Sequence, residues 1–169
     1  TDFTYNATTG LVTTITAPAA TTGGVRPKTS YNYTALQAYV KNGSGSIVAT
    51  GQPISKLTTI SRCQTTASCS GTLDEVKTTI NYGPQTAGTP NNLLPASQTT
   101  GSGTGSVSAT IAFNYDAMGN VTAVDGPLAG NADTIVMRYD AARQVVGVVL
   151  PDPDGAGARK RSAQRITYN

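Results

Sequence analysis

The chain has 169 residues, of which 38% are hydrophobic and 12% charged, and its net charge is +3. This low charge is not typical of a disordered protein, and no apolar run approaches the roughly 20 residues that a membrane-spanning helix needs. The sequence is rich in threonine, valine, isoleucine and tyrosine and has no long runs of helix-favouring residues, so the composition favours an all-β fold.

The first predicted element is a β-hairpin. In FTYNATTGLV, residues 3–12, the alternating Phe3 and Tyr5 lead into Asn6 and a polar turn that ends at Gly10. Asparagine caps such a turn by accepting backbone amide hydrogen bonds, and glycine supplies a positive φ. A return strand is predicted over 11–16. Because the chain begins inside a strand pattern, we expect it to be cut from a longer one.

The second predicted hairpin lies in YNYTALQAYV, residues 31–40. Tyr31 and Tyr33 alternate, a four-residue turn segment follows, and Tyr39-Val40 is expected to begin the return strand. This copy of the pattern is therefore expected to be short and local.

Further strands are predicted from apolar alternation and turn clusters, over 46–50, 56–62, 75–82, 92–98 and 106–115. The 75–82 segment ends in a weaker copy of the pattern at Tyr82. We interpret 99–105 as a hairpin loop rather than a flexible linker, since strong strand patterns flank it closely.

The two cysteines, Cys63 and Cys69, lie six residues apart. A zinc site would need more cysteine or histidine ligands than the chain contains. A local disulfide that closes a small loop is the favoured interpretation, with a pair of free thiols as the alternative. A disulfide would indicate an oxidising compartment, such as the periplasm, the cell surface or the medium.

The tyrosine pattern is fullest in FNYDAMGNVTAVDGP, residues 113–127. Tyr115 is followed by Asp116, then a turn with Gly119, then a return strand from Val121. We predict that the aspartate caps the turn and that the glycine adopts a positive φ. The tyrosine ring is expected to stack on neighbouring units while its hydroxyl reaches a wet rim.

Two more copies follow along the chain. MRYDAARQVVGVV, residues 137–149, has Tyr139 and Asp140 in the same places, although Arg143 stands where the turn glycine would be. RITYN, residues 165–169, begins the pattern again with Tyr168 and Asn169. Because an isolated hairpin is only marginally stable, such units must pair side by side.

Tyr-Asp-x-x-Gly followed by an apolar strand resembles the YD repeat of RHS (rearrangement hot spot) and teneurin-like proteins. The motif is complete in YDAMGNV, partial in YDAARQV and YNATTGLV, and weakest in YTALQAYV. The resemblance implies stacked antiparallel β-hairpins that form a curved sheet strip with open edge strands at both ends. It implies one β-repeat domain over residues 1–169. The hairpins would start near Tyr5, Tyr33, Tyr82, Tyr115, Tyr139 and, as an incomplete unit, Tyr168.

No catalytic constellation is expected, so we predict that the protein is not an enzyme. The absence of histidine from the sequence excludes Ser-His-Asp and Cys-His arrangements. Asp74 and Glu75 are neighbours on a predicted strand and would point to opposite faces. Asp116 and Asp140 occupy equivalent turn positions, which suits capping better than acid–base chemistry.

Neither a metal, a cofactor nor a nucleic acid is expected as a ligand. Asp152 and Asp154 are assigned to a Pro-Asp-Gly turn, because the other oxygen ligands of a calcium loop are missing. The basic run Arg159-Lys160-Arg161 has no aromatic or groove-reading motif beside it. We therefore assign this run to a solvated, charge-protected strand edge.

The leading functional hypothesis is self-association. The chain starts with Phe3 and Tyr5 and ends with Ile166 and Tyr168, in the same phase of the same repeat. Two open edges of matching phase would allow head-to-tail pairing of identical chains into a filament. The protein would then be a non-enzymatic structural protein, extracellular or at a bacterial cell surface.

Two alternatives remain. The chain could be an excised wall segment of an RHS shell that encapsulates a toxin, in which case its partners are the flanking repeats of a longer parent chain. It could also be a cell-surface adhesin that binds glycans through exposed tyrosines such as Tyr31 and Tyr39. None of the three hypotheses requires a membrane span.

Overall fold

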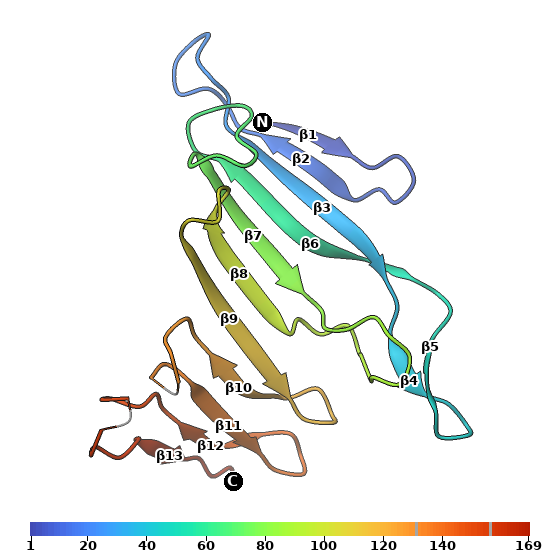
Figure 1. Ribbon diagram of the computed structural model, residues 1–169, viewed down its shortest axis with the longest axis vertical. Helices are drawn as coiled ribbons and strands as arrows, with labels where there is room; N and C mark the ends of the chain where they lie inside the picture. Colours follow the sequence, from blue (N-terminus) through green and yellow to red (C-terminus); the bar gives the residue numbers. More distant parts are fainter. Residues whose placement is uncertain (131, 156) are drawn as a thin grey trace. The chain divides into compact units, whose positions relative to one another are not determined.

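The computed structural model describes residues 1–130, 132–155 and 157–169, and it is all-β (Figure 1). Its strands are β1 (Asp2–Tyr5), β2 (Val12–Thr16), β3 (Lys28–Leu36), β4 (Tyr39–Lys41), β5 (Ile47–Ala49), β6 (Ile54–Cys63), β7 (Glu75–Asn81), β8 (Ser97–Ser102), β9 (Ser108–Tyr115), β10 (Val121–Asp125), β11 (Ile135–Tyr139), β12 (Val145–Val149) and β13 (Ala163–Arg165). No helix long and apolar enough to cross a membrane occurs within these described ranges.

Eleven of the described strands form one sheet, in the order β1-β2-β3-β6-β7-β8-β9-β10-β11-β12-β13, and β4 pairs with β5 separately. Neighbouring strands run antiparallel wherever their register is defined, and β1 and β13 are the end strands of the order. The prediction of antiparallel hairpins with open edge strands at both ends is confirmed. By its contacts the chain divides into two compact units, Thr1–Ser108 and Ala109–Asn169, and each is described by itself below.

The first hairpin of the N-terminal unit joins β1 to β2. Tyr5 pairs with Val12 beside a β-bulge. The Asn6 side-chain oxygen accepts hydrogen bonds from the amides of Thr8 and Thr9, at 3.0 and 2.9 Å, and Gly10 has a φ of 68°. Asparagine and glycine therefore close this turn by their own local chemistry.

The second hairpin differs from the sequence prediction. Strand β3 returns through β6, where Tyr33 pairs with Leu57, and not through Tyr39-Val40. The segment between them forms the separate β4–β5 hairpin, which is held outside the main sheet by hydrogen bonds between the Tyr39 and Asn91 backbones. The return strand thus lies across an insertion that local turn signals could not reveal.

The strand predicted over 92–98 was also misplaced, because β8 begins only at Ser97. Leu93 has a φ of 58° and cannot continue a strand. The buried side chain of Asn91 accepts the Leu93 amide and donates to the Tyr82 carbonyl, both at 2.8 Å. These bonds hold the segment before β8 in a turn. The 99–105 stretch divides between β8 and a tight turn, so it is not a linker.

The C-terminal unit contains the hairpins β9–β10 and β11–β12, followed by β13. Tyr115 pairs with Val121, and Tyr139 pairs with Val145, each beside a β-bulge. In the first turn Gly119 has a φ of 84°. At the equivalent place in the second turn, Arg143 has a φ of 64°, a conformation that glycine adopts far more readily than arginine.

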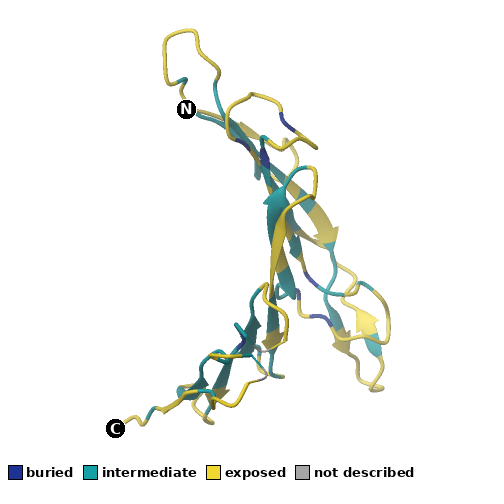
Figure 2. Cartoon of the chain, turned by 60° about the vertical axis from the view of Figure 1, so that its left-hand side comes forward, coloured by how far each residue is buried: buried dark blue, intermediate teal, exposed yellow. Residues whose placement is uncertain are grey.

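One face of the hairpins is apolar and neither face is deeply buried. Partners directly opposite in a ladder share a face. An apolar residue stands two positions before each of four signature tyrosines, and it lies opposite another apolar residue. These pairs are Phe3 with Ile15, Tyr31 with Ile60, Phe113 with Val124, and Met137 with Val148. Most described positions are half-buried or exposed (Figure 2), and no large described side chain is fully buried. The hairpins are therefore held together mainly by their ladders and by contacts along one layer.

Candidate functional site

The signature tyrosines occupy one repeated position. Four of them lie in the first strand of a hairpin and pair, beside a bulge, with an apolar residue at or near the start of the return strand. These pairs are Tyr5 with Val12, Tyr33 with Leu57, Tyr115 with Val121, and Tyr139 with Val145. A bulge sets two residues against one and increases the local twist, so it fixes register at each of these points.

Three tyrosine hydroxyls bond to the neighbouring hairpin. Each donates to the carbonyl of an apolar residue at or near the start of a return strand: Tyr82 to Leu57 at 2.9 Å, Tyr139 to Val121 at 2.9 Å, and Tyr168 to Val145 at 3.0 Å. We call this hydroxyl–carbonyl bond a tyrosine junction. It links the first strand of one hairpin to the bulge of the hairpin before it.

The tyrosine junction gives the hydroxyl a fixed partner, where the sequence indicated only a wet rim. The Tyr82 ring is buried, and burial raises the pKa of its phenol, so it remains a neutral donor at physiological pH. The ammonium of Lys56 lies 4.8 Å from the centre of the same ring. The junction therefore combines ring packing with a directional bond.

We predict that Tyr139→Phe lowers the free energy of unfolding by about 1 kcal/mol, because it removes one hydrogen bond and keeps the ring. Tyr33→Phe is the matched control, since the Tyr33 hydroxyl has no hydrogen-bond partner among the described residues. Urea unfolding of the two variants checks this. Equal stability of both variants and the unchanged chain would argue against the junction.

The turn aspartates are engaged in capping. The Asp116 carboxylate accepts hydrogen bonds from the amides of Met118 and Asn120, both at 2.9 Å, and from the Asn120 side chain at 2.8 Å. The Asn120 side chain, followed by its backbone amide, holds the pKa of Asp116 below its usual range. Asp140 accepts the Gln144 amide at 2.9 Å in the same way. Both carboxylates are already committed to the backbone.

Arg143 ties two successive turns together. Its guanidinium donates to the Asn120 side-chain oxygen at 3.1 Å and to the Met118 carbonyl at 2.7 Å, both in the preceding turn. These bonds explain why an arginine is retained at a position with a positive φ. The sequence showed only that the glycine was missing there.

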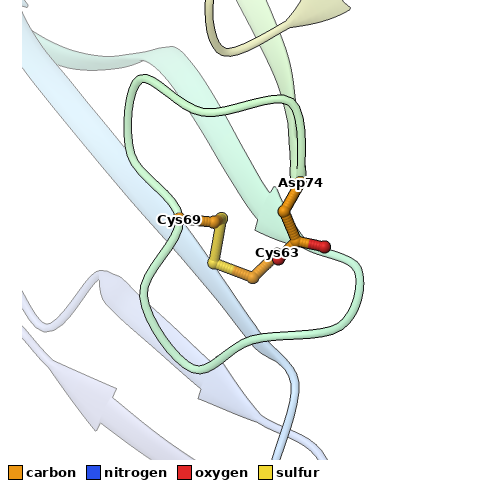
Figure 3. Close-up of side chains that lie close together, drawn as sticks. All are labelled: Cys63, Cys69 and Asp74. Carbon is orange, nitrogen blue, oxygen red and sulfur yellow. A yellow bond between two sulfur atoms is a disulfide. The ribbon is translucent and has the colours of Figure 1, made fainter.

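Cys63 and Cys69 form a disulfide (Figure 3). Their Cα atoms are 5.5 Å apart, and both residues are buried. The disulfide prediction is confirmed. The two sulfurs and a carboxylate oxygen of Asp74 lie within 4.8 Å of one another. Because the sulfurs are bonded to each other, they cannot act as thiolate ligands, so this cluster does not fit a metal ion in the oxidised protein.

Asp74 instead caps the disulfide-closed loop. Its carboxylate accepts the amide and hydroxyl hydrogens of Thr65 at 2.8 and 2.6 Å, and those of Thr66 at 3.0 and 2.6 Å. These bonds, the Thr65 hydroxyl first, lower the pKa of Asp74 from its ordinary 3.8 to about 2.

Glu75 begins β7 and is a buried carboxylate, which the sequence did not indicate; Asp74 precedes the strand, so the two do not lie on one strand as predicted. Only 3% of the residue is exposed, and its side chain accepts hydrogen bonds from the Ser61 hydroxyl and, at 2.7 Å, from the Gly71 amide. The Ser61 hydroxyl, followed by the Gly71 amide, holds the pKa of Glu75 below its ordinary value against the opposing effect of burial. The carboxylate thus pins the loop onto β6.

We predict that this loop opens in acid. The pKa values of Asp74 and Glu75 are lower in the folded state, so their contribution is complete above their ordinary pKa values near 4 and is lost as the pH falls toward 2. Amide hydrogen exchange at Thr65 and Thr66, followed from about pH 5 to about pH 2 by NMR, should show a loss of protection beyond the intrinsic pH effect. Asp74→Asn is the control that removes one of the two titrating groups. Protection that is independent of pH would contradict the prediction.

The edge strands expose the predicted assembly residues. Phe3, Tyr5 and Tyr168 are 50%, 59% and 50% exposed, and Ile166 is half-buried. Within the part of the chain that the structure describes, β1 pairs with β2 alone, and β13 pairs with β12 alone. Asn169, expected to cap a following turn, is exposed next to Tyr168. The two edges belong to different compact units.

Other predicted surface residues are already occupied. The Tyr39 hydroxyl donates to the Gln85 carbonyl at 3.1 Å, so Tyr39 does not offer a free sugar-binding edge. Arg161, expected in a solvated run, donates to the carbonyls of Leu150 and Thr134. Asp152 and Asp154 lie in a turn, where Asp154 accepts the Arg159 amide at 3.0 Å.

Comparison with models of known protein families finds no match to this chain, and a search of curated proteins finds none. We therefore infer the function from the chain's own geometry. That geometry offers repeated hairpins, tyrosine junctions between them, and two edge strands with one open side each.

Proposed function

We propose that this chain is a structural protein without catalytic activity, which acts by extending a β-sheet through its edge strands outside the cell or at its surface. The observation that carries the proposal is that, among the described strands, β1 and β13 each pair on one side only, beside exposed aromatic side chains. Exposed strand edges of this kind are templates for pairing with another strand.

The tyrosine junction supplies a register for such pairing. In the described hairpins, a tyrosine at the end of a first strand reaches the carbonyl that opens the neighbouring return strand. Tyr5 holds this position on β1, pairs with Val12 and is 59% exposed. A return strand placed along the open side of β1 would bring an acceptor carbonyl to its hydroxyl.

The strand that completes each edge should be a return strand. Both β1 and β13 are first strands of the tyrosine pattern, and first strands pair antiparallel with return strands throughout the ladders. Flanking YD-type repeats of a longer chain would supply such strands, as the resemblance to RHS shells implies. This source fits the alternation better than direct contact between β13 and β1, which would set two first strands side by side.

Self-association into a filament is the second candidate. It is favoured by the exposure of Phe3, Tyr5 and Tyr168 beside the two edges. A contact between two different edges does not close on itself, so repeated copies would form an open polymer.

Two observations support a non-catalytic, extracellular role. The turn and loop carboxylates Asp74, Glu75, Asp116 and Asp140 accept hydrogen bonds from the loops that they cap. The Cys63–Cys69 disulfide suits an oxidising environment.

The test is electron microscopy and sedimentation of the natively purified protein, with its intact mass. We expect either filaments of a subunit of 17.3 kDa or a much larger chain in which further repeats cover the edges. Deleting residues 164–169 removes the end of β13 and the Tyr168 junction, and it should abolish filaments; Tyr33→Phe is the control. A 17.3 kDa chain that stays monomeric at all concentrations, or a truncated chain that still polymerises, would contradict the proposal.

A further inference from the structure

A hollow of about 830 Å³ in the C-terminal unit lies along β12 and β13, and its lining includes Arg138, Gly147 and Arg165 together with the carboxylate of Asp140. The lining continues past β13 as far as Tyr168. Among the described strands β13 is the last of the sheet order, beside β12 (Figure 1). A groove beside a strand edge can receive an extended segment that adds to the sheet.

The backbone of β13 alternates between its two sides. The Ile166 amide donates to the Val146 carbonyl at 3.0 Å, and the Leu150 amide donates to the Ser162 carbonyl at 2.9 Å. In an antiparallel ladder the residues between such positions direct their amide and carbonyl groups to the other side. The groups of Ala163, Arg165 and Thr167 therefore face the open edge, with Arg165 at the centre.

The lining of this hollow holds two arginines and one carboxylate, that of Asp140, which accepts the Gln144 amide. Arg165 lies opposite Gly147, and Gly147 lies opposite Arg138, so both arginines are on one face with no side chain between them. Among the described residues no carboxylate lies within 4 Å of either guanidinium. The salt bridge found in the described structure is elsewhere, between Arg26 and Asp2 of the N-terminal unit. A carboxylate directly opposite Arg165 would form a favourable cross-strand pair.

We propose that the open edge of β13 accepts an extended segment that carries a carboxylate opposite Arg165. The inference rests on the proposed function, because it specifies the strand that completes this edge. It commits to an acidic, strand-forming peptide segment as the occupant.

Strand β10 shows what such a segment looks like. In its pairing with β9, Val121 lies opposite Tyr115, Val124 opposite Phe113, and Asp125 opposite Ala112. Ala112 stands three residues before Tyr115, as Arg165 stands three residues before Tyr168. A strand of the β10 type, docked in the same register, places its aspartate opposite Arg165 and its valines opposite Ile166 and Tyr168.

The test uses the full chain labelled with ¹⁵N and two synthetic peptides: one with the sequence of residues 119–127, the other with the change Asp125→Asn. NMR titration should shift the amides of Ala163, Arg165 and Thr167 at lower concentrations of the acidic peptide. Arg165→Gln should weaken binding of the aspartate peptide up to about fivefold and leave binding of the asparagine peptide unchanged. Arg159→Gln, an exposed charge away from the groove lining, is the matched control.

A tethered version avoids weak binding. Residues 117–127 are appended after Asn169, so that Tyr168-Asn169 continues as Tyr115-Asp116 does, with aspartate or asparagine at the Asp125 position of the tail. Arg165→Gln should destabilise the aspartate form more than the asparagine form.

The outcomes separate the inference from the proposed function. Equal binding of both peptides, or equal effects of Arg165→Gln on both tails, would overturn the acidic specificity while edge pairing stands. If neither peptide nor tail protects the β13 amides, both proposals are overturned. Binding of an oligouronate at this edge in place of the peptides would also overturn the inference, since the occupant would then be an acidic glycan.

Discussion

Replacing Cys63 and Cys69 together with alanine should lower the free energy of unfolding by about 2 kcal/mol. The disulfide joins residues six positions apart, and closing so short a loop removes conformational entropy mainly from the unfolded chain. Both residues are also buried among the few such positions of the described structure. Denaturant unfolding under oxidising conditions measures the change.

Chemical reduction of the unchanged protein is the control for this experiment. It should reproduce most of the loss, whereas the alanine variant should not respond to the reductant. A variant as stable as the oxidised protein would mean that the loop is held by Asp74 and Glu75 alone, and that the disulfide contributes nothing to stability.

Gly103→Ala should destabilise the protein by about 1–3 kcal/mol. A Cβ at this position would lie 2.7 Å from the Glu75 Cβ and 2.8 Å from the Thr72 carbonyl oxygen, closer than packed atoms approach. Glu75 cannot move away without losing its hydrogen bonds to Ser61 and Gly71. The substitution therefore separates the β8 turn from the disulfide loop.

Gly43→Ala is the matched control, because a Cβ at Gly43 would meet nothing within 4 Å and its φ is not in the left-handed region. Thermal and urea unfolding of the two variants should differ clearly. If both alanine variants are as stable as the unchanged chain, Gly103 does not pack closely against Glu75 in the folded protein.

The sequence predicted those parts of the fold that depend on short-range chemistry. The turns after Tyr5, Tyr115 and Tyr139 are closed by their own asparagine or aspartate, so a local pattern was enough to locate them. The disulfide was predicted for the same reason, since its cysteines are neighbours in the chain.

The failures share a dependence on distant residues. Strand β3 pairs with β6 across the inserted β4–β5 hairpin, and Asn91 holds the segment before β8 by bonds to Tyr82 and Leu93. A turn signal read residue by residue carries no information about such partners. The same holds for Glu75, whose burial comes from the loop that folds over it.

The tyrosine junction could be predicted only in part from the sequence. The sequence indicated that tyrosines such as Tyr139 recur at one phase, but not that the hydroxyls of Tyr82, Tyr139 and Tyr168 bond to the hairpin before them. The acceptor is a backbone carbonyl, which no side-chain pattern can reveal. A recurrent tyrosine next to a bulged turn is the signal that could have been followed.

We propose above all that the edge strands β1 and β13 pair with further strands in the native protein. Hydrogen–deuterium exchange on the natively purified protein, resolved at Ala163, Arg165 and Thr167, tests it most directly. We expect these outward amides of β13 to be protected as strongly as the ladder amides of β11 and β12. Exchange at the rate of an unstructured chain, in a sample whose ladder amides remain protected, would show an uncovered edge and contradict the account.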